Sequence, residues 1–364
     1  MTPTTFLLLV AGLVLLVMGA EFLVKGASRI AAVLRISPLI IGLTIVAYGT
    51  SAPEMFVSVM SSFSGQGDIA MGNVVGSNIC NVLLILGLSA LVTPLIVTKQ
   101  IIRSDVPIMI GVSVLLLIFC LDGQLSRVDS LILFIGGIAY TLSLMYQSNK
   151  QKTTHDEFTE EYGFEGNVTS GLWLKNIIFV VGGLALLVLG SRWLVDSAVT
   201  IATALGVNEL LIGLTIVAIG TSLPELATSV VASFRGERDI AVGNVLGSNI
   251  FNILAVLGFS GTISPNGIQV SETLIQFDIP VAIAVAFACL PIFYSGQRID
   301  RWEALLFLFY YLAYTGYLIL DATRHETLPT YIDIMLWFVL PLTVITLVTL
   351  GIHEKIAAKK RRSL

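Results

Sequence analysis

Long apolar runs, separated by short polar segments, fill most of this chain. A helix that crosses a bilayer needs about 20 mostly apolar residues, and runs of that length recur throughout the sequence. They predict eleven membrane-spanning helices, near residues 4–24, 37–62, 69–95, 105–121, 128–146, 174–198, 208–233, 240–264, 276–295, 302–320 and 331–351. The first run has no basic segment before it and is too long for the apolar part of a signal peptide, so we interpret it as a retained helix.

The composition agrees with a chain that has lipid as its solvent. Hydrophobic residues make up 55% of the 364 residues and charged residues only 12%, whereas soluble domains carry about 25% charged residues. The net charge of −4 gives no reason to expect a nucleic-acid partner. Cys80, Cys120 and Cys289 stand far apart in apolar stretches. They predict buried side chains rather than a disulfide framework or a metal clip.

The two halves of the chain repeat each other. At an offset of 171 residues, residues 42–87 and 213–258 are identical at 30 of 46 positions without a gap. The offset spans five predicted helices, an odd number, so the second copy enters the membrane from the opposite side. Such inverted repeats are typical of secondary transporters, which bind substrate near the bilayer midplane between the copies. We therefore predict an all-α integral membrane fold with two inverted-topology repeats of five transmembrane helices plus one extra C-terminal helix.

The distribution of basic residues predicts the orientation, because cytoplasmic loops of membrane proteins are rich in Lys and Arg. If the N-terminus lies outside, only Arg127, Arg192 and Arg324 of the 20 Lys and Arg residues fall on or toward the outer side. The C-terminus is then cytoplasmic. We expect four segments: the first repeat at 1–148, a polar cytoplasmic linker at 149–173, the second repeat at 174–321, and the extra helix with a basic cytoplasmic tail at 322–364.

Each repeat places one glutamate within a membrane-spanning run. The sequences GTSAPE and GTSLPE end at Glu54 and Glu225. A carboxylate in the middle of a bilayer costs several kcal/mol unless it is paired, protonated or bound to a cation, and no Lys or Arg lies in these two segments. Two such carboxylates, brought together between the copies, would repel each other unless a divalent cation, sodium ions or protons compensated them. Oxygen ligands suit hard cations such as Ca²⁺ and Na⁺, so we predict a cation site.

Other polar residues lie at helical spacing around the glutamates. Thr50 and Ser51 precede Glu54 by four and three residues, which places all three on one helix face. Pro53 and Pro224 lack an N–H and should break their helices, which would free carbonyl oxygens near Gly49 and Gly220. Broken backbone is tolerated at membrane depth where it lines a cavity.

A second motif follows in each copy, GNVVGSNICN at 72–81 and GNVLGSNIFN at 243–252. Ser77 and Asn81 are four residues apart and share a helix face. The paired glycines of each motif predict close helix packing. For Asn73 and Asn244 the pattern leaves open whether they join helices or line the site.

These doubled motifs, GTS-x-PE and GN-x-x-GSN-I-x-N, resemble the cation/Ca²⁺ exchanger superfamily, specifically its prokaryotic sodium/calcium exchanger-like branch. The resemblance covers roughly residues 1–320. It implies a ten-helix core in a prokaryotic inner (plasma) membrane, with alternating access by sliding of the first and sixth helices. It also implies Ca²⁺ and Na⁺ as transported substrates and no cofactor. The oligomeric state is not predicted.

The resemblance further implies a set of ligands. Glu54 and Glu225 would be the central Ca²⁺ ligands, shared with Na⁺. Hydroxyl or carbonyl oxygens would come from Thr50, Ser51, Thr221 and Ser222, flanking sodium sites from Ser77 and Ser248, and backbone carbonyls from Ala47 and Ala218. Some family members carry an aspartate at one of the positions held here by Asn81 and Asn252. This chain therefore has only two formal negative charges at the site, which leaves the number of coupled sodium ions open.

Three other functions fit parts of the pattern. In a proton/Ca²⁺ exchanger, the glutamates would alternate between protonated and cation-bound forms. A cation channel would need no counter-ion. An intramembrane hydrolase would use the carboxylates as acid and base, but such catalysis needs two different environments rather than two copies of one. We therefore do not expect an enzyme.

Overall fold

The computed structural model describes residues 3–34, 36–151, 170–207, 212, 215–216, 218–294 and 296–346 of the chain. Most of the predicted linker, the first part of the predicted span 208–233 and the basic tail lie outside the described residues. Within the described part, nine helices are long and apolar enough to cross a membrane, and a bent pair of helices, Pro38–Thr50 and Ala52–Phe63, would make a tenth. The shorter apolar helix Leu223–Phe234 is the second half of the span predicted at 208–233.

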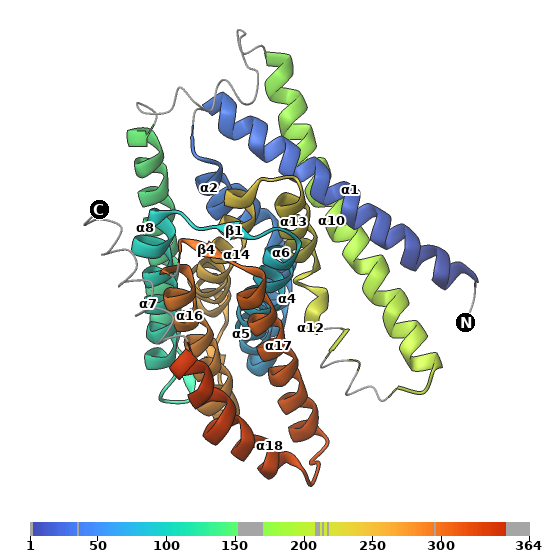
Figure 1. Ribbon diagram of the computed structural model, residues 1–364, viewed down its shortest axis with the longest axis vertical. Helices are drawn as coiled ribbons and strands as arrows, with labels where there is room; N and C mark the ends of the chain where they lie inside the picture. Colours follow the sequence, from blue (N-terminus) through green and yellow to red (C-terminus); the bar gives the residue numbers. More distant parts are fainter. Residues whose placement is uncertain are drawn as a thin grey trace.

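The helices follow the predicted repeat (Figure 1). The first copy contains α1 (Pro3–Leu34), α2 (Pro38–Ile41), η1 (Gly42–Val46), α3 (Ala47–Thr50), α4 (Ala52–Phe63), α5 (Gly67–Cys80), η2 (Asn81–Leu86), α6 (Gly87–Val92), η3 (Ile101–Asp105), α7 (Val106–Phe119) and α8 (Arg127–Gln151), where η marks a π-helical turn. The second contains α10 (Ser170–Ala204), α12 (Ala218–Gly220), α13 (Leu223–Phe234), α14 (Arg238–Phe251), η5 (Asn252–Leu257), α15 (Gly258–Ile263), η6 (Leu274–Asp278), α16 (Ile279–Tyr294) and α17 (Arg301–Ala322). The extra helix begins with α18 (Leu328–Ile334) and η7 (Met335–Val339). The predicted all-α fold is confirmed.

Two short antiparallel ladders join the copies at the helix ends. Strand β1 (Leu95–Ile96) pairs with β4 (Arg298–Ile299), and β2 (Gln124–Leu125) pairs with β3 (Ile268–Gln269). The predicted alternation of spans puts β1 and β4 on one side of the membrane and β2 and β3 on the other. A span missed or added between two partners would have separated them, so the pairing agrees with the predicted number of spans.

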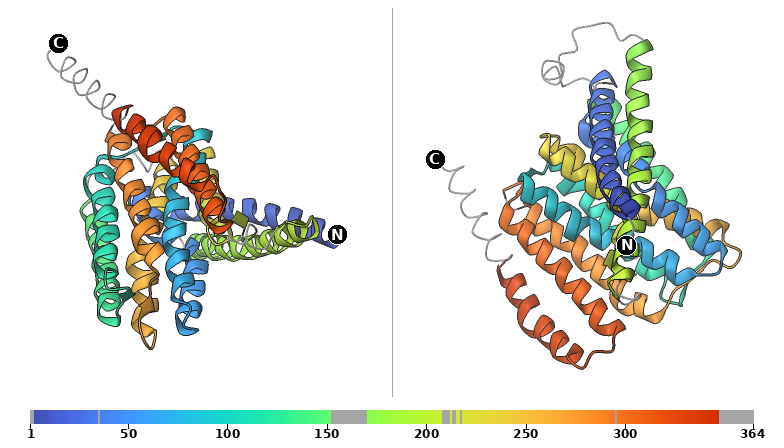
Figure 2. Two further views of the ribbon diagram at one scale, coloured as in Figure 1. Left: turned by 90° about the horizontal axis from the view of Figure 1, so that it is seen from below. Right: turned by 90° about the vertical axis from the view of Figure 1, so that its right-hand side faces the viewer.

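Helices α1 and α10 lie side by side and project from the bundle (Figures 1 and 2). Glycines permit this contact: a Cβ atom on Gly19 would lie 2.8 Å from the carbonyl oxygen of Gly183, and one on Gly183 would lie 2.7 Å from that of Gly19. Gly12 and Gly190 make the equivalent contact, at 2.8 and 2.7 Å. Backbones can approach this closely only where small residues face each other, so α1 and α10 form one interlocked pair.

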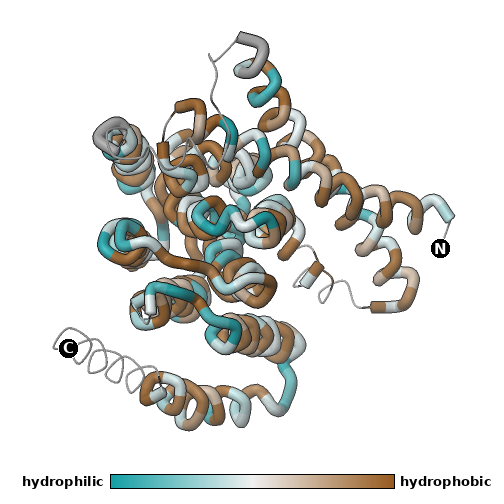
Figure 3. The backbone as a smooth tube through the Cα atoms, turned by 45° about the horizontal axis from the view of Figure 1, so that its top comes forward, coloured by the Kyte–Doolittle hydropathy of each residue, from teal (hydrophilic) through white to brown (hydrophobic). Residues whose placement is uncertain are grey.

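Most residues along these two helices are apolar (Figure 3), as expected of helices that face lipid. Leu13 and Val17 on α1 and Ile178 and Val181 on α10 are exposed. By contrast, the apolar window of the span Arg238–Ile263, which includes α14, is wholly buried. Helix α14 therefore lies at the centre of the core, where the second copy of the GN-x-x-GSN motif is enclosed by protein.

The extra helix packs on the outside of the core, next to α17. Tyr331 donates a hydrogen bond to the carbonyl of Ala313 at 2.7 Å, and Tyr310 donates one to Thr343 at 2.6 Å. None of the described residues in the apolar window of this last span is buried. The helix therefore adds to the lipid-facing surface and contributes nothing to the centre of the bundle.

Candidate cation-binding site

Both glutamates stand just after a break in a membrane helix. Helix α3 ends at Thr50, Ser51 leaves the helical conformation with ψ of 11°, and α4 continues at an angle of 47°. Pro53 has no N–H to offer the carbonyl of Gly49 four residues earlier. In the second copy α12 ends at Gly220, and Ser222, with ψ of 5°, precedes α13. The predicted breaks are confirmed.

These breaks place Glu54 and Glu225 in the first turns of α4 and α13. The free N–H groups of a first helical turn favour negative charge there. The prediction of free carbonyl oxygens holds less well. The Ser191 hydroxyl on α10 donates to the carbonyl of Gly220 at 2.8 Å, and the N–H of Ser51 donates to the carbonyl of Ala47 at 3.1 Å. Ala218, the predicted counterpart of Ala47, is the first residue of α12.

The two carboxyl groups meet in one buried site, and each is held by a serine of the other copy. Ser51 donates to Oε1 of Glu225 at 2.8 Å, and Ser222 donates to Oε1 of Glu54 at 3.3 Å. Both glutamates are only 1% exposed. The structure thus brings together the residues that the doubled GTS-x-PE motif predicts.

The second motif completes the ring of hydroxyl groups. Ser77 and Ser248 each approach Oε1 of the glutamate in their own copy at 3.5 Å. The Ser222 and Ser77 hydroxyl groups also lie 3.1 Å apart beside Glu54. Each carboxyl group therefore receives hydroxyl donors from both repeats, which fixes its orientation.

The predicted threonines contact a pair of asparagines across the repeat boundary. Thr50 donates to Oδ1 of Asn244 at 3.1 Å, and Thr221 donates to Oδ1 of Asn73 at 3.3 Å. The amide nitrogens of these asparagines donate to the backbone carbonyls of Glu225 and Glu54, at 3.3 and 3.2 Å respectively. Asn73 and Asn244 therefore brace the glutamate backbones and join the copies, which resolves the choice that the sequence left open.

Asn81 and Asn252 lie at the start of two equivalent π-helical turns, η2 and η5. Their amide groups donate to Asn249 at 3.0 Å and to Asn78 at 3.1 Å, each across the repeat boundary. Asn78 and Asn249 were not among the predicted site residues. A usable signal was present, because both are identical polar residues at equivalent positions in apolar helices.

Four oxygen atoms at this site remain without a hydrogen-bond donor among the described residues: Oε2 of Glu54 and Glu225, and Oδ1 of Asn81 and Asn252. They form two repeat-related pairs. A buried polar atom without a partner costs about 1–3 kcal/mol, and an oxygen that can only accept is satisfied by a cation. Two carboxylates with hydroxyl and amide oxygens form a donor set for hard cations. Among the described residues, no three or more His, Cys, Asp or Glu side chains come together in a group that could hold a metal ion, so a cation at this site would depend on the hydroxyl and amide oxygens as well as on the two carboxyl groups.

An enclosed, oxygen-lined and negatively charged site between two inverted repeats, formed at broken helices, defines a secondary transporter for cations. The sequence profile of the sodium/calcium exchanger protein family matches residues 4–147 and 175–320, and the chain belongs to this family. It is 42% identical to the inner membrane protein YrbG of Escherichia coli over 288 residues, 78% of this chain and 87% of that protein. It is 34% identical to the sodium/calcium exchanger MaX1 of Methanosarcina acetivorans over 345 residues, 86% of this chain and 98% of that protein.

The comparison with solved structures points to the same family as the comparison of sequences. The sodium-calcium exchanger NCX_Mj, soaked with 2.5 mM Na⁺ and 1 mM Sr²⁺, superimposes with a TM-score of 0.74 at 30% sequence identity, covering 87% of this chain and 99% of that one. The same exchanger soaked without Na⁺ and Ca²⁺ gives a TM-score of 0.73. The fold is therefore that of a sodium/calcium exchanger over nearly the whole length of that protein.

Proposed function

We propose that this protein is a secondary active antiporter that exchanges Ca²⁺ for Na⁺ by alternating access, with Glu54 and Glu225 as the central cation ligands. One observation carries the proposal: two buried carboxyl groups from inverted repeats each accept a hydrogen bond from a serine of the other repeat and keep Oε2 for a cation. The names of the relatives, which include a sodium/calcium exchanger, support the choice of ions.

The charge at the site explains why transport would be an obligatory exchange. Two carboxylates in a buried site repel each other, and desolvation makes each of them costly. Ca²⁺ compensates both charges at once, and Na⁺ ions do so in its place. The site then switches its access from one side of the membrane to the other only when a cation occupies it. Transport of Ca²⁺ in one direction therefore requires transport of Na⁺ in the other.

The remaining predicted ligands fit this scheme by position. The hydroxyl groups of Ser77 and Ser248 each lie 3.5 Å from Oε1 of one glutamate, a position that suits a flanking Na⁺ ion. The carbonyl oxygen of Ala47 accepts from the Ser51 N–H and lies 3.4 Å from the Thr50 hydroxyl, so a cation bound there would take the place of the Thr50 hydroxyl. The amide oxygens of Asn81 and Asn252 would complete the coordination without adding charge.

Alternating access would use α1 and α10 as one sliding unit. Their glycine contacts bind them to each other, while their outer surfaces meet only lipid. In the proposed orientation the N-terminus lies outside and the C-terminus is cytoplasmic, in the inner membrane of a prokaryote. The Ca²⁺ site then opens to one side or the other as this pair moves across the core.

Reconstituted vesicles test the coupling ion. We expect vesicles loaded with Na⁺, at equal pH on both sides, to take up radioactive ⁴⁵Ca²⁺, and vesicles loaded with choline to take up none. Uptake that needs only a pH gradient, and no Na⁺, would instead establish a proton/Ca²⁺ exchanger. Ca²⁺ flux that needs no counter-ion and appears as unitary currents would establish a channel.

A further inference from the structure

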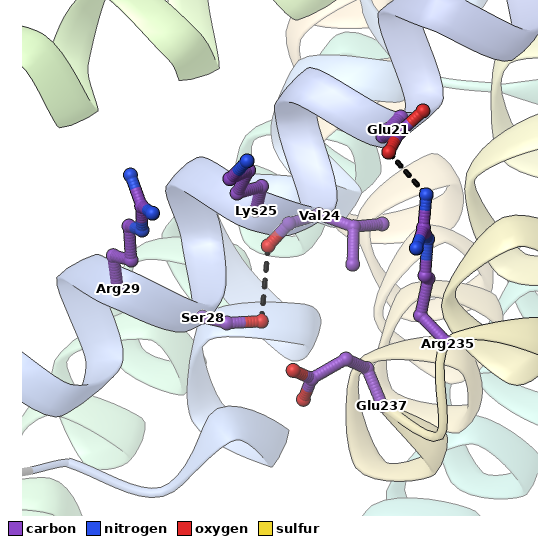
Figure 4. A pocket seen from close by; sticks show the side chains of 7 residues that line it. All are labelled: Glu21, Val24, Lys25, Ser28, Arg29, Arg235 and Glu237. Carbon is purple, nitrogen blue, oxygen red and sulfur yellow. Dashed lines mark hydrogen bonds and ion pairs between the residues drawn. The ribbon is translucent and has the colours of Figure 1, made fainter. Parts of the chain in front are cut away.

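A pocket of about 300 Å³ lies between α1 and the turn that joins α13 to α14 (Figure 4). It is lined by Glu21, Val24, Lys25, Ser28, Arg29, Arg235 and Glu237. Arg235 reaches from the turn to Glu21 on α1 and forms an ion pair with it. The pocket is therefore bounded on one side by α1 and on the other by the core.

Two basic residues that line this pocket, Lys25 and Arg29, lie with a third, Lys175, around one aromatic ring between α1 and α10. Lys25 and Arg29 on α1 and Lys175 on α10 lie 6.0, 5.8 and 5.8 Å from the centre of the Phe179 ring. The ring face attracts each cation weakly, but three positive groups around one ring repel each other. Within the described part of the chain, no carboxylate forms an ion pair with any of the three. The cluster therefore has the chemistry of an anion site.

The surroundings of the cluster favour a lipid over a soluble anion. Phe179 stacks on Phe22 with ring centres 5.4 Å apart, and Leu174, Ile177 and Ile178 expose apolar side chains beside it on α10. The cations thus lie at the end of a lipid-facing surface, at the level of phospholipid head groups. Basic pockets between membrane helices at this level bind anionic head groups.

We propose that the phosphate of an anionic phospholipid binds Lys25, Arg29 and Lys175 at the mouth of this pocket, with its acyl chains along the apolar surface of α10. The acidic side chain of Glu237 on the core side keeps the phosphate next to α1. The ion pair between Glu21 and Arg235 closes the remaining wall. The site requires a phosphate group with net negative charge, so a zwitterionic lipid binds it more weakly.

The position of the site gives the lipid a role in exchange, a step that rests on the proposed function. The phosphate holds the α1–α10 pair, whereas the opposite pocket wall belongs to the core. If that pair slides during transport, the shape of the pocket changes with it. A lipid that binds one shape better than the other shifts the equilibrium between the two states, so the exchange rate depends on the anionic lipid.

Lipid binding is measured first, without transport. The purified full-length chain is titrated with phosphatidylglycerol or phosphatidylcholine, and the bound lipid is counted by native mass spectrometry. The test variant is Lys25→Gln/Arg29→Gln. The matched control is Lys99→Gln/Arg103→Gln, which removes two exposed basic residues at the same four-residue spacing elsewhere on the chain.

We expect the wild type and the control to prefer phosphatidylglycerol, and the test variant to lose about 25-fold in affinity for it, since each basic residue near an anionic head group contributes about fivefold. Equal affinity in the test variant and the wild type would overturn the proposal. Inorganic phosphate that displaces the lipid at millimolar concentration would show that the site takes a soluble anion instead.

The second arm measures ⁴⁵Ca²⁺ exchange in vesicles of phosphatidylcholine with and without phosphatidylglycerol. The wild type and the control should change rate with the anionic lipid, and the test variant should not. A test variant that binds the lipid poorly yet keeps the same lipid dependence would refute the role in exchange. If Na⁺-driven exchange fails in every variant, the proposed function fails, while the binding arm still decides the lipid site.

Discussion

At the scale of single residues, the site depends on hydroxyl groups that reach across the repeat boundary. Ser51 donates a hydrogen bond to Glu225, and Ser222 donates one to Glu54, so neither copy can form the site alone. The sequence predicted which residues meet, because identical motifs in inverted copies must lie around one axis. It did not predict the crossed pairing, since spacing along a helix shows which residues share a face but not which partner that face meets.

Replacing Glu54 with Gln removes one negative charge from the site and nearly preserves the shape of the side chain. Glutamine keeps an acceptor for Ser77 and Ser222 but leaves one negative charge, too little to compensate Ca²⁺. We expect exchange in vesicles to fall to the background of protein-free vesicles. Because the variant also removes the repulsion between the carboxylates, its melting temperature without Ca²⁺ should equal or exceed that of the wild type. Added Ca²⁺ should raise the melting temperature of the wild type but not that of Glu54→Gln.

The control for this variant is Glu272→Gln, which removes an exposed carboxylate outside the site. It should keep both exchange and stabilisation by Ca²⁺. Normal exchange by Glu54→Gln would contradict the assignment of the site. A failure to fold would appear as an altered elution profile in size-exclusion chromatography, which distinguishes a lost structure from a lost ligand.

At the scale of elements, proline and glycine determine how the helices break and pack. The breaks before Pro53 and Pro224 follow from local chemistry and were predicted. The second paired-glycine motif packs as predicted, since a Cβ atom on Gly243 or Gly247 would lie 2.8 Å from the carbonyl oxygens of Leu39 and Leu43 respectively. The counterparts of these partners for the first motif, residues 210 and 214, lie outside the described residues.

The contact between α1 and α10 offers a test with two adjacent glycines. A Cβ atom on Gly183 would lie 2.7 Å from both the Gly19 carbonyl oxygen and the Leu23 nitrogen, whereas one on Gly182 would meet nothing within 4 Å. Gly183→Ala should therefore force the helices apart and cost about 1–3 kcal/mol, the usual range for overpacking. Thermal unfolding in detergent measures this loss. Gly182→Ala should leave the melting temperature unchanged, and equal effects of the two substitutions would refute the close contact.

At the scale of the whole molecule, the sequence predicted the inverted repeat but not the details that break its symmetry. The repeat is visible because 30 of 46 positions coincide. The ion pair between Glu21 and Arg235 has no counterpart in the other half, where Arg192 and Ser64 stand at the equivalent positions. Symmetry arguments therefore could not find it. The two-residue strands are also too short for any periodic pattern to reveal.

The orientation of the molecule in the membrane remains a prediction from charge, and the buried native cysteines make it easy to test. Cys80, Cys120 and Cys289 are all buried, so a single exposed cysteine should be the only site that reacts with a membrane-impermeant maleimide. Ser64→Cys lies in an exposed turn that the prediction places outside, and Lys99→Cys in one that it places inside. In intact cells we expect labelling of Ser64→Cys alone, and in permeabilised cells labelling of both. Labelling of Lys99→Cys alone in intact cells would show that the orientation is the opposite of the predicted one. It would leave the Glu54/Glu225 site unchanged, because an inverted repeat presents the same ligands to both sides.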